Sequence, residues 1–394
     1  MTVRVSKPAI NLREKVSELD KPTGLKGNEL MRSDTAQEAR DLIGAGRKNK
    51  FINGGMRIAQ RGTSLSLNAD TAYSLDRIKH IVRGTHDSTY TQSADHPDGF
   101  SKSLKVSPNS TYTPSGSDNA SFQTFIEGQD LQDLQFGTSN AKTFTVSFYA
   151  KSASSNSGHQ YTFQIRSYPT SGDTRIKNFP FVVTTTWQRF TFTFTGDADK
   201  DIANSSGNGF ACLWNLDAGP DDIVPQYTDW YELGKFQCVT GQSHFQNNTS
   251  NEFYLTGVQI EIGENATEFE HLSYGEDLAL CQRYFVRMDG SSGGISTGDG
   301  AIATLAMWSS GNAYGPIFLP GEMRVAPSLS DWNDLVWYHK GNTYTITSGN
   351  IHFAGSCTNR VECRIKSVTN GVSGECGWLR VDSGAGYMDF NAEL

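Results

Sequence analysis

Hydrophobic and polar residues alternate with a period of two through the middle of the chain. The alternation is clearest in four segments: 142–151, 161–166, 188–195 and 253–262. In the first of them Phe144, Val146 and Phe148 fall on one face of an extended chain. Turns rich in Gly, Asn, Asp and Ser separate such segments, and no helical pattern lies between them. The pattern predicts a mainly β protein whose central part is a two-sheet antiparallel β-sandwich, with a jelly roll as the natural candidate.

The first 48 residues have helical spacing instead. Asn11 with Glu14, and Asp34 with Gln37, have the spacing of capping signatures at helix starts. Two helices this short are marginal in water and need a partner, although a frayed terminus is the alternative. We therefore expect a helical attachment segment that binds a larger assembly through its apolar stripe, which consists of Leu12, Val16, Leu19, Leu42 and Ile43.

A third pattern begins after residue 274 and is dense in glycine and aromatic residues. The segment 274–285 fits either a short helix or the lead-in to a strand. Candidate strands follow at 302–307, 335–339, 343–346, 361–367 and 378–381. The chain thus divides into an attachment segment (1–48), a jelly roll (49–274) and a smaller C-terminal β domain (275–394), which is the candidate receptor-binding tip.

Composition narrows the classes of partner. The chain has 394 residues and a net charge of -8, and no basic run marks a nucleic-acid-binding surface. No apolar run approaches the ~18 residues of a membrane-spanning helix, and the charged start lacks the apolar stretch of a signal peptide. We expect a chain made in a cytoplasm, without membrane insertion and without a nucleic-acid partner.

The cysteines and one acidic segment are candidates for structural or metal sites. Six cysteines occur without a CxxC pair, so buried free thiols are favoured, with a disulfide among Cys357, Cys363 and Cys376 as the alternative. The alternation of Asp197, Asp199 and Asp201 is typical of the opening of a calcium loop, but the later positions do not fit an EF-hand. An acidic surface turn is the simpler interpretation, a structural calcium is the alternative, and no other cofactor is expected.

The sequence contains no catalytic signature. A Gly-x-Ser-x-Gly elbow is missing, and no spacing singles out the pair of carboxylates that glycoside hydrolysis requires. We expect a protein that is not an enzyme, with glycoside hydrolase or lyase activity as the alternative.

Aromatic residues are the most plausible binding chemistry. Flat side chains stack on the C–H faces of sugar rings, whereas buried tryptophans serve the core. One group lies in the glycine- and acid-rich segment 207–236, which we expect to form loops at one end of the sandwich: Trp214, Tyr227, Trp230 and Tyr231. The second group lies in the C-terminal domain: Trp308, Tyr314, Trp332, Trp337 and Tyr338.

Several segments, in order, resemble tail-fibre-like virion proteins of tailed bacteriophages of the marine type. The opening segment 51–64 (FINGGMRIAQRGTS) is similar to the strand that opens their domain, and YSLDRI at 73–78 follows it, with Ile78 where many members have tryptophan. Further similar segments are VSFYAK (146–151), WQRFTFTF (187–194), GVQIEIGENATEFE (257–270), YGEDLALCQRYF (274–285) and MRVAPS (323–328). The resemblance implies a jelly roll like that of carbohydrate-binding modules, mounted on a virion.

From these patterns and this resemblance we expect a structural virion protein, assembled in the host cytoplasm and exposed on the particle exterior. As a tail-fibre or spike component it would dock on other tail or capsid proteins through residues 1–48 and contact host surface polysaccharide. The resemblance also implies a homotrimer. Two alternatives remain open: a capsid decoration or spacer protein that binds no glycan, and a polysaccharide depolymerase.

Overall fold

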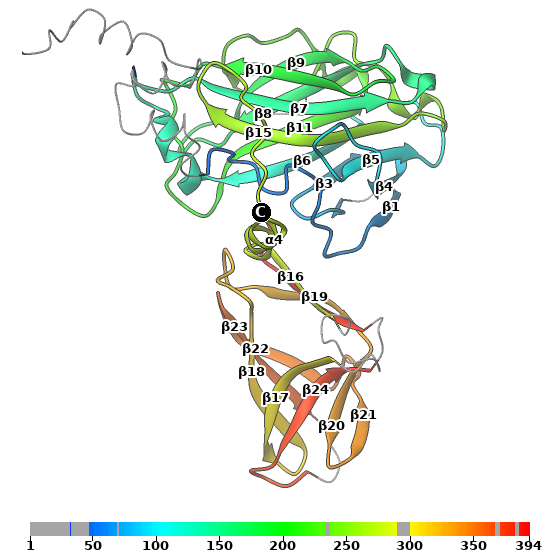
Figure 1. Cartoon of the computed structure of the whole chain (residues 1–394), viewed down its shortest axis with the longest axis vertical. Coiled ribbons are helices and arrows are strands. Elements are labelled where there is room, and N and C mark those ends of the chain that lie inside the picture. The colour runs from blue at the N-terminus through cyan, green and yellow to red at the C-terminus, as the bar shows by residue number, and fades with distance from the viewer. Residues whose placement is uncertain are drawn as a thin grey trace, which may run out of the picture. The chain divides into compact units, whose positions relative to one another are not determined.

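The computed structural model describes Arg32 and residues 47–68, 71–232, 237–289, 300–366, 371–382 and 386–394. Lys50–Leu394 form one compact unit of strands and short helices (Figure 1), so the expected mainly β class is confirmed. The expected helices of the attachment segment, with Leu12, Val16, Leu19, Leu42 and Ile43, lie outside the described residues. Within the described residues, no helix is long and apolar enough to cross a membrane.

The first part of this unit is a β-sandwich. Its elements, in chain order, are β1 (Ser64–Asn68), β2 (Ala72–Tyr73), β3 (Lys79–Arg83), β4 (Asp87–Ser93), β5 (Ser103–Pro108), β6 (Asn119–Glu127), the 3-10 helix η1 (Gly128–Leu134), β7 (Phe144–Ser152), η2 (Ser154–Asn156), β8 (Gln160–Ser167), β9 (Arg175–Val182), β10 (Gln188–Phe194), β11 (Asn208–Ala218), η3 (Pro220–Asp222), β12 (Ile223–Val224), β13 (Tyr231–Glu232), β14 (Cys238–Val239), η4 (Phe245–Asn247) and β15 (Phe253–Ile262).

Two antiparallel sheets make up the sandwich. One has the strand order β1-β4-β5-β15-β7-β10 and the other the order β13-β9-β8-β11-β6-β3-β2. Many neighbours, such as β15 beside β5 and β7, are far apart in the chain, so the connections cross between the sheets as they do in jelly rolls. The expected two-sheet sandwich is therefore present.

The inner faces of the two sheets form an aromatic core. Phe144, Val146 and Phe148 of β7 are fully buried, as their alternation predicted. Trp214 of β11 stacks on Phe122 with ring centroids 5.4 Å apart and an interplanar angle of 12°. Offset stacked rings of this kind stabilise a core beyond the burial of their area alone.

One expectation about the sandwich is wrong. The segment 207–236 was expected to form loops, yet Asn208–Ala218 is β11, a central strand between β8 and β6. Phe210, Cys212 and Trp214 alternate along it and face the core, while its other positions after Asn208 are also buried. Because this strand is buried on both faces, it lacks the alternation of apolar and polar residues that marks a half-exposed strand. Its Gly, Asn and Asp residues therefore resembled those of a loop.

The segment after the sandwich is a helix, which settles the alternative left open by its sequence. Helix α4 (Tyr274–Gln282) begins with a capping box, because the Ser273 hydroxyl accepts from the Glu276 N–H and the Glu276 carboxylate accepts from the Ser273 N–H. Such reciprocal caps satisfy two N–H groups that a helix start otherwise leaves unpaired.

A second β structure follows α4. Its strands are β16 (Phe285–Asp289), β17 (Gly300–Ser309), β18 (Asn312–Phe318), β19 (Ser328–Asn333), β20 (Leu335–His339), β21 (Asn342–Thr345), β22 (Ile351–Cys357), β23 (Arg360–Lys366), β24 (Cys376–Val381) and β25 (Tyr387–Asn391). Seven of them form the sheet β21-β20-β24-β17-β18-β23-β22, called here the C-terminal sheet, and three form the sheet β16-β25-β19. The strands expected near 302–307, 335–339, 343–346, 361–367 and 378–381 are confirmed as β17, β20, β21, β23 and β24, within a residue or two at most ends.

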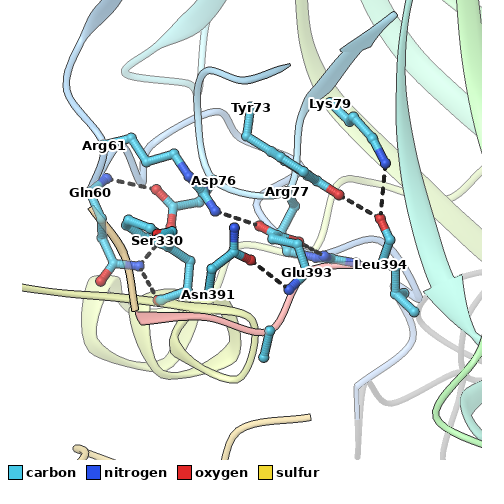
Figure 2. Close-up of polar contacts among 12 residues, drawn as sticks. Gln60, Arg61, Tyr73, Asp76, Arg77, Lys79, Ser330, Asn391, Glu393 and Leu394 are labelled. Carbon is cyan, nitrogen blue, oxygen red and sulfur yellow. Dashed lines mark hydrogen bonds and ion pairs between the residues drawn. The ribbon is translucent and has the colours of Figure 1, made fainter. Parts of the chain in front are cut away.

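Polar contacts join the last residues of the chain to the sandwich (Figure 2). Glu393 pairs with both Arg61 and Arg77, and its Oε1 lies 3.2 Å from Nη2 of Arg61. The carbonyl oxygen of Leu394 accepts from the Tyr73 hydroxyl at 2.6 Å and from Nζ of Lys79 at 3.3 Å. Residues far apart in sequence are thus held together by buried or half-buried charges.

Candidate functional site: the outer face of the C-terminal sheet

The C-terminal sheet has a core side and an outer side. Leu305 and Met307 of β17, with Trp337 of β20, face the second hydrophobic core. The alternate positions of the same strands point away from that core because successive side chains of a strand take opposite faces. We call this side the outer face, and its residues are Thr304, Ala306, Trp308, Tyr314, Pro316, Phe318, Tyr338, Arg360, Glu362, Arg364, Lys366, Cys376, Trp378 and Arg380.

A stacked aromatic pair lies on the outer face. Tyr338 and Trp378 are register partners on β20 and β24, and their rings are nearly parallel, with centroids 5.8 Å apart and an interplanar angle of 17°. The guanidinium carbon of Arg380 lies 4.9 Å from the centroid of the Tyr338 ring. Trp378 is 48% exposed, although large aromatic side chains usually bury most of their area. The pair therefore presents a flat apolar surface to solvent.

A shallow open groove lies beside this pair. It has a volume of about 400 Å3, is formed by residues 301–304 of β17 with Pro316 and Phe318 of β18, and lies where the paired register of these strands has ended. Thr304 belongs both to the groove and to the row of Trp378, since the two are register partners. Phe318, which lines the groove, is 68% exposed.

The sequence candidates of the C-terminal domain separate into two groups. Trp308 is 75% exposed, and Tyr314 and Tyr338 are half-buried on the outer face. The Tyr314 hydroxyl donates to Oε2 of Glu362 at 2.6 Å, which raises the pKa of Tyr314. Trp332 lies instead on β19 of the three-stranded sheet and packs against the second core.

The prediction that Trp337 binds a glycan is wrong, because the residue is fully buried and no face of its ring reaches solvent. Sequence reasoning placed strand 378–381 correctly but missed Trp378 and Phe318. The alternation of side chains along a strand could have identified Trp378. Its neighbour Leu379 is apolar and buried, so Trp378 must point to the opposite, outer face.

The candidates of the sandwich are also divided. Trp214 is fully buried in the first core and cannot stack on a ligand. Trp230 is half-buried, and its indole N–H donates to the Thr195 carbonyl at 2.9 Å. Tyr227 and Tyr231 form a separate stacked pair, with centroids 4.1 Å apart and an interplanar angle of 4°.

The calcium candidates do not fit a cation site. Oδ2 of Asp197 lies 2.7 Å from Nε of Arg175, and Asp201 accepts from the Thr170 hydroxyl at 2.8 Å. Asp199 is exposed and lies 4.0 Å from the same arginine. In the part of the chain that the structure describes, no group of three or more His, Cys, Asp or Glu residues is placed to hold a metal ion.

All six cysteines are free in the structure, but the burial expected for them holds for four and is wrong for two. Cys212, Cys238, Cys281 and Cys363 are buried, whereas Cys357 and Cys376 are exposed. Burial raises the pKa of Cys363 to about 12, which keeps that thiol protonated and unreactive near neutral pH.

Comparisons with known proteins give likenesses among solved structures. No family model and no curated protein matches the sequence. The chain is similar to the enzymatically active domain of tailspike protein 4 of bacteriophage CBA120, at 11% identity over 55% of this chain and 21% of that chain, with a TM-score of 0.29. It is also similar to a family 11 carbohydrate-binding module of Clostridium thermocellum in complex with a mixed-linked tetrasaccharide, at 13% identity over 53% and 98% of the two chains, with a TM-score of 0.27. A xylan-binding domain of family 22 gives 13% identity over 52% and 98%, with a TM-score of 0.27. The chain thus spans about a fifth of the tailspike, and the sandwich assignment rests on the strand orders above, not on these likenesses.

Proposed function

We propose that this chain is a non-enzymatic structural protein of a tailed-phage virion that binds host surface polysaccharide through the outer face of its C-terminal sheet. The observation that carries the proposal is the stacked pair of Tyr338 and Trp378, which is exposed beside an open groove.

The chemistry of this surface suits sugars. A sugar ring offers apolar C–H faces, and these pack on exposed aromatic rings, while hydroxyl groups need polar partners at the edges of the contact. The outer face supplies both, with Trp308, Trp378 and Phe318 for the apolar contact and Thr304 and Arg364 beside them. Large exposed apolar surfaces are uncommon on monomeric proteins and mark interaction sites.

Binding without hydrolysis is supported by the charges of the same face. Glycoside hydrolases use two carboxylates a fixed distance apart. Among the described strand residues of the outer face, Glu362 is the one carboxylate, and it already accepts a hydrogen bond from Tyr314.

The virion assignment rests on the ordered motifs at 51–64, 257–270 and 274–285 that resemble tail-fibre-like proteins. In this proposal residues 1–48 dock on tail or capsid proteins, and the chain assembles as a homotrimer. Three weak sites held on one particle would bind a repeating polymer far more tightly than one site, because the second contact is intramolecular.

Two measurements test the proposal. The purified full chain is titrated with polysaccharides extracted from host cells. The affinity of the Trp308→Ala and Trp378→Ala variants is expected to fall by about tenfold or more relative to the wild type. Tyr274→Ala is the matched control, since Tyr274 is 58% exposed but lies on α4. Gold-labelled antibody against the C-terminal domain is expected at the distal tail of virions. Binding that is unchanged in both tryptophan variants contradicts the assignment of the site to the outer face. Gold spread over the capsid contradicts the tail assignment and favours a decoration protein.

A further inference from the structure

We infer that the polysaccharide recognised by the outer face is anionic, carrying carboxylate or sulfate groups that bind to the arginines of β23. This inference rests on the proposed function and adds the chemical class of the ligand. It comes from the charges of the outer face, which differ in sign from the charge of the whole chain.

The outer face is basic although the chain is acidic. The chain has a net charge of -8 and an isoelectric point near 5.5. On the described strands of the outer face there are four cations, which are Arg360, Arg364, Lys366 and Arg380, against the single carboxylate of Glu362. His352 of β22 is exposed and is the register partner of Arg364. A local field of this sign attracts anions to this surface.

Several arginines elsewhere in the structure are neutralised by carboxylates. Arg283 holds Glu127 through two hydrogen bonds of 2.7 Å each, and Arg287 holds Asp389 in the same bidentate way. Arg175 has Asp197 as its partner at 2.7 Å. In those places the guanidinium group serves the fold.

Arg360 and Arg364 differ from these arginines. Both are exposed, and neither lies within ion-pair distance of a carboxylate among the described residues. Nη2 of Arg364 donates to the Asn312 side-chain oxygen at 3.3 Å, which is a neutral partner. The nearby carboxylate of Glu362 is bound by the Tyr314 hydroxyl. The two guanidinium groups are therefore available to an external anion.

The spacing suits a chain of sugars more than a single small anion. Along the sheet β24 is separated from β23 by β17 and β18, which makes three steps of about 4.8 Å, or roughly 14 Å. Trp378 lies on the first of these strands, the groove on the middle two, and Arg360 and Arg364 on the last. Apolar sugar faces would pack on Trp378 and Phe318 while acidic substituents reach β23. The planar guanidinium fork binds carboxylate and sulfate groups through paired hydrogen bonds.

The test compares polymers that differ in charge alone. Binding of the full chain is measured to dextran and dextran sulfate, and to polygalacturonate and its methyl ester. We expect at least one acidic polymer to bind about tenfold more tightly than its neutral counterpart, with an affinity that falls as salt is added. Preference for polygalacturonate assigns carboxylate groups, and preference for dextran sulfate assigns sulfate groups.

The residues are tested with variants of matched charge. Arg360→Gln with Arg364→Gln is expected to abolish the preference for the acidic polymer. The control, Arg83→Gln with Lys102→Gln, removes the same charge from the sandwich and should keep the preference. If both double variants lose affinity equally, the attraction is a property of net charge and the inference is overturned.

The failure of the inference differs from the failure of the proposed function. Equal binding of neutral and acidic polymers, weakened by Trp378→Ala, overturns the anionic ligand and leaves glycan binding in place. If neither these polymers nor the host polysaccharide extracts bind, both are overturned.

Discussion

Arg77 of the sandwich and Glu393, which follows the last strand, form an ion pair in which both side chains are buried, with exposures of 1% and 4%. The guanidinium carbon of Arg77 also lies 3.4 Å from the centroid of the Tyr284 ring. A buried pair is weak evidence of net stabilisation, but removal of one partner leaves an uncompensated charge in a medium of low dielectric constant.

We therefore predict that Glu393→Gln destabilises the protein by about 3 kcal/mol or more, because Arg77 stays charged and buried. The free energy of unfolding in urea measures the effect. Glu264→Gln is the control, since Glu264 is exposed and should change stability by less than about 0.5 kcal/mol. Equal stability of the two variants would show that Arg77 is solvated in solution.

The second prediction concerns two tryptophans that both lie on β-strands but differ in burial, Trp214 of β11 and Trp378 of β24. Trp214 is fully buried, so Trp214→Ala should cost roughly 3 to 5 kcal/mol of unfolding free energy. Trp378 is 48% exposed, so Trp378→Ala should leave stability nearly unchanged while it weakens glycan binding. Thermal unfolding and polysaccharide binding, measured on both variants, separate the two roles. A large loss of stability in Trp378→Ala would contradict its assignment to the outer face.

Strands β7 and β11 show what the sequence could and could not predict about the fold. The alternation of Phe144, Val146 and Phe148 predicted β7 and its buried face correctly, because one face of that strand is apolar and the register of the pattern is unambiguous. Trp214 was misplaced because β11 is buried on both faces, so period-two alternation disappears and Gly and Asn resemble loop residues.

The sequence predicted only part of the candidate site. Trp308, Tyr314 and Tyr338 were named, but their joining into one surface depends on the order β20-β24-β17-β18-β23, which pairs strands distant in the chain. Arg360, Arg364 and Lys366 of β23 belong to the same surface because of this strand order. No local pattern encodes the strand order, since it follows from the packing of the whole sheet.

The six free thiols give a third prediction. A thiol-specific reagent applied to the native protein should modify Cys357 and Cys376, which are exposed, within minutes. Burial raises the pKa of Cys212, Cys238 and Cys281, so these thiols and Cys363 should react only after unfolding. Mass spectrometry of the labelled peptides distinguishes the sites. Failure of the two exposed thiols to react under non-reducing conditions would indicate the disulfide that the sequence left as an alternative.

His80 makes stability depend on pH. It is completely buried, its Nε2 contacts the Ser74 hydroxyl, and burial lowers its pKa from 6.5 to about 3. Its ring also packs against Tyr90, with centroids 3.5 Å apart. The folded protein therefore holds this imidazole neutral, whereas the unfolded chain takes up a proton below pH 6.5.

It follows that the contribution of His80 to stability is complete above pH 6.5 and is lost progressively as the pH falls from 6.5 toward 3. The loss is roughly 1.4 kcal/mol for each pH unit in that window. We predict that the unfolding of His80→Gln takes up about one proton fewer than the unfolding of the wild type. The number of protons is obtained from the slope of the unfolding free energy against pH between 6 and 4. His96→Gln, in which an exposed histidine is replaced, is the matched control variant. If His80→Gln keeps the wild-type slope, His80 must take up its proton in the folded state.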